Sequence, residues 1–203
     1  MSDSKTGLVL QALGVAAGVA VSILAIWGNY FRAKLAAPKL RLVPHNLGGN
    51  LTRLTLGGWV VYYHLKVQNR RPWSVAKNCR VLLKQIDVRG PDQEFNRAPL
   101  VVPLQFVWAP AELTSALVDI TREHVLDFIR LKENDDTAYP VLYGYPNEFR
   151  GLLTANGAIR YGLEVAADGV FDSRLYVFEV AWNGRWSRNM KEMAHNLTVK
   201  QIR

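Results

Sequence analysis

The feature that most constrains this chain is an uncharged stretch near its N-terminus. Residues 7–27, GLVLQALGVAAGVAVSILAIW, contain no charged side chain, and Gln11 and Ser22 are their only polar ones. At about 1.5 Å per residue, a helix of this length crosses the roughly 30 Å hydrocarbon core of a bilayer. Backbone groups in lipid must be paired within the segment, and aromatic residues at its end mark a membrane interface. The sequence therefore predicts a transmembrane α-helix over residues 7–31.

Two other interpretations of this stretch stay open. A cleaved signal peptide has a shorter apolar core and a basic start, whereas here only Lys5 precedes a long core. The small-residue site at residues 36–37 is followed by Pro38, which opposes cleavage. A buried globular helix is usually apolar on one face, and this stretch is apolar all round. We expect an uncleaved anchor between a tail of residues 1–6 and a juxtamembrane linker of residues 32–38.

Charge is distributed unevenly around the stretch. The basic residues Arg32, Lys34, Lys39 and Arg41 follow it closely, and we expect them to lie at the membrane surface. Positive flanks stay cytoplasmic. We therefore predict a single-pass protein of the cell inner membrane with its N-terminus outside and its domain in the cytoplasm; a periplasmic or extracellular domain is the alternative. Residues 39–90 carry ten Lys or Arg against one acidic residue, so the basic part of the chain adjoins the predicted anchor.

Small residues recur at helical spacing within the predicted span. Gly14, Gly18 and Ser22 are each four residues apart and share one face of a helix. Such a face permits close approach of a second transmembrane helix, although glycine and alanine are common in membrane helices in any case. A homo-oligomer formed through this face is therefore one candidate interaction.

The pattern changes to period two after Pro38. The clearest run is residues 59–68, in which Val61, Tyr63, Leu65 and Val67 share one face. Further strands are expected over residues 39–43, 51–56, 77–88, 100–108, 116–120, 158–166, 174–182 and 197–202. Residues 125–131 fit either a strand or a helical turn, and residues 187–195 a short helix.

Turn residues punctuate these runs. We expect turns at residues 45–50 and 57–58, and a two-residue hairpin turn at Asn183-Gly184. Pro103 makes the run over residues 100–108 an edge or bulged strand. Short strands separated by turns predict an all-β fold, a single Ig-like β-sandwich over residues 39–203.

Two segments in the centre of the chain resemble adjacent strands of bacterial Ig-like domains, including those related to cell adhesion. They are YHLKVQN, ending at Asn69, and VAKNCRV, around Ala76 and Cys79. The resemblance implies that the Asn69 side chain caps the turn and that the small Ala76 lets the strands pass closely. The whole chain resembles uncharacterised bacterial proteins with an N-terminal membrane anchor followed by such a domain, through residues 38–40, 62–63, 69–79 and 181–186. Arg70-Arg71-Pro72-Trp73 departs from the adhesion type, where a glycine is expected, and the resemblance implies no activity.

We find no motif of an enzyme or a cofactor site. The four histidines are far apart in sequence, and no zinc, phosphate-loop, dinucleotide or serine-hydrolase pattern is present. Cys79 is the one cysteine of the chain and lies in an alternating run, where a buried core thiol is expected rather than a nucleophile. The acidic turn at residues 133–136 lacks the spacing of a calcium loop. We predict a protein that is not an enzyme and that has no metal, cofactor or catalytic residues.

Two surface features stand out from this background. The turn with Arg70, Arg71 and Trp73 is either a solvated face or a contact for anionic lipid headgroups; we do not expect a nucleic-acid partner. The second feature, YPVLYGY, carries Tyr139, Tyr143 and Tyr145 and is either a partner-binding loop or a segment that folds its tyrosines over an open end of the sandwich. The expected partners are thus the lipid bilayer and an unknown protein.

These observations predict a membrane-anchored, non-enzymatic interaction module that presents a soluble β-sandwich at the membrane surface. The alternative is an oligomerising membrane effector or sensor, assembled through its transmembrane helix.

Overall fold

The chain divides into two compact units, residues 1–37 and residues 38–203, which are described separately. A computed structural model describes residues 15, 17–19, 21–23, 25, 27–28, 30, 35–55, 57–111, 114–170 and 174–203. In the first unit the residues described between 15 and 30 are α-helical. Within the described part of the chain, no helix has both the length and the hydropathy to span a bilayer. Most of the predicted span over residues 7–31 lies outside the described residues.

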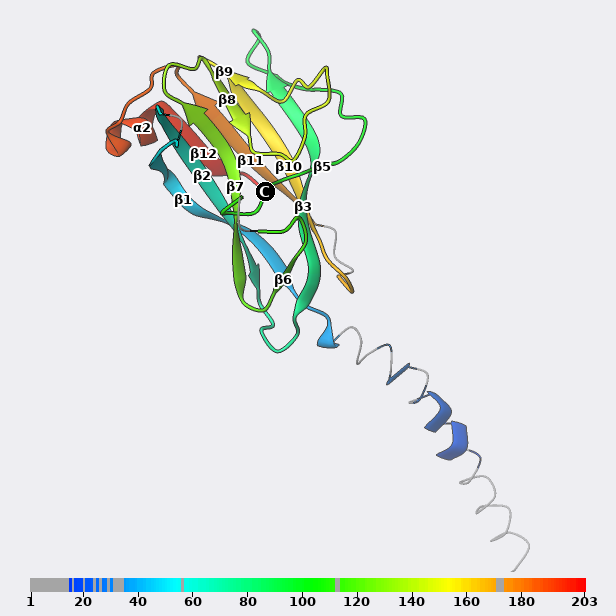
Figure 1. The fold of residues 1–203 in the computed structure, drawn as a ribbon. Coiled ribbons are helices and arrows are strands. Elements are labelled where there is room, and N and C mark those ends of the chain that lie inside the picture. Colours follow the sequence, from blue (N-terminus) through cyan, green and yellow to red (C-terminus); the bar gives the residue numbers. More distant parts are fainter. Residues whose placement is uncertain are drawn as a thin grey trace, which may run out of the picture. The chain divides into compact units, whose positions relative to one another are not determined.

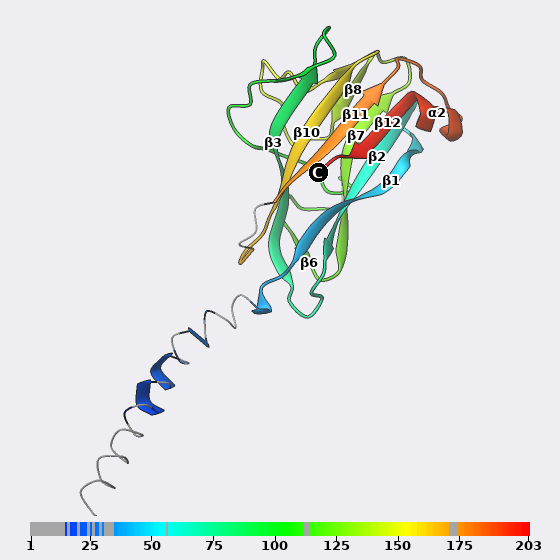
Figure 2. The ribbon, with the colours of Figure 1, turned by 180° about the vertical axis from the view of Figure 1, so that it is seen from behind.

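The second unit consists of two antiparallel sheets that face each other as a β-sandwich (Figure 1). The first sheet has the strand order β1 (Leu40–Arg53), β2 (Trp59–Asn69), β7 (Glu123–Lys132), β8 (Thr137–Pro140) and β9 (Leu153–Thr154). The second has the order β12 (Leu197–Gln201), β11 (Leu175–Trp182), β10 (Ala158–Ala166), β3 (Ala76–Arg89) and β4 (Phe95–Arg97). β5 (Leu104–Gln105) and β6 (Val118–Ile120) also pair with β3. Figure 2 brings β3, β10, β11 and β12 to the front.

The core between the sheets follows the predicted alternation. Val61, Tyr63, Leu65 and Val67 of β2 are at most 1% exposed, and the residues between them are half-buried on the outer face. Cys79 is also fully buried in this core, and its burial raises the pKa of the thiol to about 12. The prediction of a core thiol at Cys79 is confirmed.

The turn predicted over residues 45–50 is wrong, because β1 is one continuous strand through this region. Its pairing with β2 jumps from Asn46 opposite His64 to Asn50 opposite Tyr62, so β1 bulges out of the ladder. A local hydrogen bond stabilises the bulge: the Asn46 side chain accepts from the Gly48 N–H at 3.0 Å. Gly49 has φ +75°, and a Cβ atom there would lie 2.7 Å from the Val61 side chain. Glycine is required here for both reasons.

The hairpin predicted at Asn183-Gly184 is also wrong. β11 and β12 do pair, but residues 183–189 and helix α2 (Met190–Asn196) connect them. The Asn183 Oδ1 accepts from the Arg185 N–H at 3.0 Å, which forms an Asx-type turn that leads away from β11. The short helix expected over residues 187–195 is confirmed as α2, whose Met193 is buried in the core.

The segment of residues 104–109 crosses from one sheet to the other. It pairs with β3 through Leu104 and Gln105, and then the Val107 carbonyl accepts from the Asp127 N–H of β7 at 3.0 Å. Phe106 and Trp108 on this segment are 1% exposed. Of the run expected over residues 100–108, only Leu104–Gln105 is a strand, with single bridges at Phe106 and Trp108, and residues 100–103 are in no strand. The part that pairs lies at an edge and closes one side of the sandwich, as expected for a run that contains a proline.

Two buried tyrosines allow a direct test of how a hydrogen bond to a buried hydroxyl affects the stability of this core. The Tyr161 hydroxyl on β10 donates to the Gly151 carbonyl at 2.7 Å, whereas the Tyr63 hydroxyl has no hydrogen-bond partner among the residues that the structure describes. Burial raises the pKa of both phenols, so both stay protonated. We expect Tyr161→Phe to lower the free energy of unfolding by about 1.5 kcal/mol, and Tyr63→Phe to leave it unchanged or raise it by up to about 1 kcal/mol.

Urea unfolding of the wild type and both variants checks this prediction. The two substitutions remove the same atom from equally buried rings, so each controls for the other. A loss in Tyr63→Phe as large as that in Tyr161→Phe would contradict it.

Candidate functional site

The two outer sheet faces carry charged side chains that are largely paired with each other. On the first sheet, Lys66 lies 3.0 Å from Glu123. On the second, Arg160 lies 2.8 Å from Glu179 and Lys84 lies 3.8 Å from Glu164. Cross-strand pairs of this kind stabilise a solvated sheet face. The basic residues Lys66 and Lys84, which are close in sequence to Arg70, therefore belong to the sheet faces.

One pair on the first outer face, the half-buried His64 and the buried Asp127, has the residue types of a proton-transfer site. The His64 Nδ1 lies 2.9 Å from a carboxylate oxygen of Asp127, although the contact lacks hydrogen-bond alignment at Nδ1. The Tyr62 ring stacks near His64 at 6.3 Å between centroids. No other acid, histidine or cysteine completes a group of metal ligands here or elsewhere in the described residues.

The end of the domain at which residues 38 and 39 enter is organised by Asn69, which is 6% exposed. Its Oδ1 accepts from the Arg71 N–H at 3.0 Å and from the Lys39 N–H at 3.4 Å. Its Nδ2 donates to the carbonyls of Ser74 at 2.6 Å and Ile120 at 3.2 Å. Asn69 thus caps the turn of residues 70–74, as the Ig-like pattern implies, and ties it to the first residues of the domain.

This turn holds Trp73 with 75% of its surface exposed. The backbone N–H of Arg70 donates to the Lys39 carbonyl at 2.8 Å, and the Asn69 N–H donates to the Arg122 carbonyl at 2.7 Å. Lys39, Arg70 and Arg122 are exposed, and Arg71 is half-buried. We call this surface the proximal rim and define it by Lys39, Arg70, Arg71, Trp73 and Arg122.

The structure describes only some of the other residues predicted at the membrane surface or in the membrane span. Arg41 is exposed on β1, directly opposite Gln68. Arg32, Lys34 and the span residue Gly14 lie outside the described residues. Gly18 and Ser22 are described and helical, and the Ser22 hydroxyl donates to the Gly18 carbonyl at 2.9 Å. Association through the Gly14, Gly18 and Ser22 face stays a prediction.

The three tyrosines predicted as a partner loop have different environments. Tyr139 belongs to β8, where the Arg130 guanidinium lies 5.9 Å from the ring centroid. The Tyr145 hydroxyl donates to the Pro140 carbonyl, and its ring packs on Phe149 at 5.5 Å. Tyr143 is 49% exposed, and no hydrogen bond of its hydroxyl is present within the described part of the chain. Only Tyr143 therefore has the freedom that a partner contact requires.

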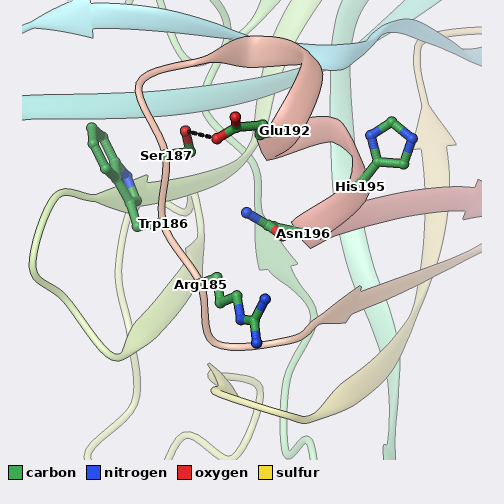
Figure 3. Close-up of a pocket in the computed structure, with 6 residues that line it drawn as sticks. All are labelled: Arg185, Trp186, Ser187, Glu192, His195 and Asn196. Carbon is green, nitrogen blue, oxygen red and sulfur yellow. Dashed lines mark hydrogen bonds between the residues drawn. The ribbon is translucent and has the colours of Figure 1, made fainter.

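Two open hollows adjoin each other at the end of the domain opposite the proximal rim. The first has a volume of about 360 Å³ and the second about 280 Å³. The first is lined by Arg185, Trp186, Ser187, Glu192, His195 and Asn196 (Figure 3). The second is lined by residues of β3, β11, β12 and the turn before β10, and it shares His195 and Asn196 with the first. We call the pair the distal hollows.

The side chains of the distal hollows are held by local hydrogen bonds. The Asn183 Nδ2 donates to the Asn196 Oδ1 at 3.0 Å, and the Trp182 indole donates to the Arg185 carbonyl at 3.1 Å. The His195 Nδ1 lies 2.7 Å from the Lys191 carbonyl, which can only accept, so Nδ1 carries the proton. The hollows are therefore preorganised, polar surfaces.

Sequence reasoning missed the distal hollows. Their residues come from β3, the turn before β10, β11 and α2, which are far apart along the chain. The one local signal was the run AWNGRW over residues 181–186, in which tryptophan, asparagine and arginine are concentrated.

Comparison with known proteins gives no family: no protein-family model matches the chain, and no curated protein matches its sequence.

Proposed function

We propose that this chain is a membrane-anchored, non-enzymatic interaction module. In this proposal residues 7–31 span the inner membrane, the proximal rim lies against anionic lipid on the cytoplasmic side, and the opposite end of the sandwich meets a protein partner. The observation that carries the proposal is the exposed Trp73 on a turn bonded to Lys39. The turn is thereby fixed beside the residues at which the predicted anchor joins the domain.

We also propose that the sandwich is Ig-like, and two features support this. β2 pairs with β7 in one sheet, while β3, β10 and β11 are neighbours in the other, which corresponds to the B–E and C–F–G pairings of Ig domains. The buried Tyr161 on β10 donates its hydroxyl to the upstream Gly151 carbonyl, as the tyrosine corner of strand F does. Cys79 is free, so this domain would lack the inter-sheet disulfide of antibodies.

The chemistry of the proximal rim suits a membrane interface. Tryptophan is enriched at the headgroup level because its ring is apolar and its N–H is polar. A Lys or Arg near an anionic leaflet contributes about 1 kcal/mol, and this attraction is lost within a Debye length of about 10 Å. Lys39, Arg70 and Arg122 have no acidic partner within the described residues, which leaves their charges available to lipid headgroups.

A vesicle-binding assay tests this role. A fragment of residues 38–203 contains every residue of the hydrophobic core. We expect it to sediment with phosphatidylserine-containing vesicles and not with purely phosphatidylcholine vesicles. Trp73→Ala and Arg70→Gln should each weaken this binding by about fivefold, the loss expected for one interfacial contact worth about 1 kcal/mol.

Tyr143→Ala is the matched control, because Tyr143 is also an exposed aromatic residue and lies outside the proximal rim. This variant should bind vesicles as the wild type does. Equal binding to neutral and anionic vesicles, or an effect of Tyr143→Ala as large as that of Trp73→Ala, would refute the assignment of the rim to anionic lipid.

A further inference from the structure

The distal hollows present hydrogen-bond donors that the protein does not use itself. Within the described residues, the Arg185 guanidinium and the Asn196 Nδ2 have no hydrogen-bond or ion-pair partner. The Arg89 guanidinium makes only one long contact, 3.4 Å to the Asn156 carbonyl. In Figure 3 the Asn196 amide points into the first hollow, toward the space between Arg185 and Ser187. Donors from β3, the loop after β11 and α2 therefore meet at one surface.

Among the residues that line the hollows, the two arginines Arg185 and Arg89 outnumber the acidic residues. Glu192 is the one carboxylate among the residues that line the hollows, and the Ser187 hydroxyl donates to it at 2.8 Å. Arg188, which follows the first hollow in sequence, is bound to Glu133 at 2.8 Å. Arg185 and Arg89 thus face the hollows as positive charges, and a guanidinium forms its strongest contacts with oxyanions.

We propose that the distal hollows bind a carboxylate on an acidic segment of a protein partner. The planar guanidinium of Arg185 matches a carboxylate in a two-bond arrangement, and the Asn196 N–H supplies a further donor. Sites for free small molecules enclose most of their ligand, whereas these hollows are shallow and open to solvent. An acidic side chain that projects from a macromolecule fits such a surface. This inference rests on the part of the proposed function that assigns a protein partner to this end of the domain.

Fluorescence anisotropy with the full-length chain in a neutral detergent tests the proposal. The probe is a fluorescein-labelled peptide of alternating Glu and Gly, and the reference is the same peptide with Gln in place of Glu. Because anionic lipid is absent, the result does not depend on lipid binding at the proximal rim. We expect the Glu peptide to bind and the Gln peptide not to bind. Arg185→Gln should weaken binding by about fivefold or more.

Arg80→Gln is the matched control, since Arg80 is exposed on β3 and does not line the hollows. It should change affinity by less than about twofold, which separates a local contact from a general effect of net charge. The hydrogen bond from Arg185 to Asn183 uses the Arg185 backbone N–H, so Arg185→Gln leaves it in place. The Arg80 side chain is exposed, so both variants should keep the wild-type melting temperature. Equal weakening by both variants, or equal binding of the two peptides, would overturn the proposal. Stronger displacement of the Glu peptide by inorganic phosphate than by succinate would overturn the assignment to a carboxylate.

Discussion

Phe128→Ala is expected to lower the free energy of unfolding by about 4 kcal/mol, as large-to-small changes at fully buried aromatic positions do. Phe128 is 0% exposed and lies at the centre of the aromatic core. Its ring centroid is 5.7 Å from Phe106, 5.8 Å from Tyr161 and 5.6 Å from Phe178. These partners come from the crossing segment and the second sheet. Phe128→Ala therefore removes ring contacts that hold separate parts of the sandwich together.

Urea unfolding of the fragment of residues 38–203 measures the effect. Phe128→Leu is the control for volume, because it keeps an apolar side chain of similar reach; we expect a loss of about 1.5 kcal/mol. A loss below about 2 kcal/mol in Phe128→Ala would show that the core collapses around the missing ring, and the central position of Phe128 would then be wrong.

Phe128 also shows why the sequence left residues 125–131 open between strand and helix. A plain strand would alternate, but Leu126, Phe128, Ile129 and Leu131 are all fully buried. The pairing with β2 moves from Tyr63 opposite Ile129 to His64 opposite Asp127, so Phe128 is an extra residue in a β-bulge. The bulge breaks the period of two, and the resulting apolar pattern resembles a helical turn.

A bulge also accounts for the turn that was wrongly predicted over residues 45–50. Strands without bulges, such as β2, follow the period-two pattern closely and were predicted to within about a residue. β1 was divided into two strands because its bulge contains Gly48 and Gly49, which are typical of turns. Whether a glycine pair reverses the chain or only displaces it depends on the neighbouring strand. The pairing with that strand cannot be deduced from the residues around the glycine pair alone.

The two candidate sites could be predicted from the sequence to different extents. The reason is again whether the residues involved are close together in the chain. The turn of the proximal rim is contiguous, so Arg70, Arg71 and Trp73 were identified from the sequence. The structure adds Arg122 and shows that Lys39, which the sequence assigned to the membrane surface, lies beside this turn through the backbone bonds of Asn69 and Arg70. The distal hollows combine side chains from several strands and one helix, and only the fold brings Arg89 and Arg185 to the same surface.

Asn69→Ala is expected to lower the free energy of unfolding by about 3 kcal/mol, because it removes the side-chain partner of one buried carbonyl, one partly buried carbonyl and two partly buried backbone N–H groups. Ala takes up no polar contact, and the turn of residues 70–74 loses its connection to Lys39 through the side chain. Asn96→Ala is the control, because Asn96 is exposed on β4. It should lower the free energy of unfolding by less than about 0.5 kcal/mol. Urea unfolding measures both variants.

The same variant links the turn to the proposed function. At a temperature at which Asn69→Ala is still folded, its turn lacks the side-chain bonds of Asn69 and is joined to Lys39 through the backbone N–H of Arg70, so the orientation of Trp73 and Arg70 is less firmly fixed. Its binding to phosphatidylserine-containing vesicles should therefore fall by about as much as that of Trp73→Ala, although every rim residue is still present. If Asn69→Ala loses stability as expected but binds vesicles like the wild type, the fixed orientation of the turn is not what brings the domain to lipid. The basic charges alone would then account for the binding.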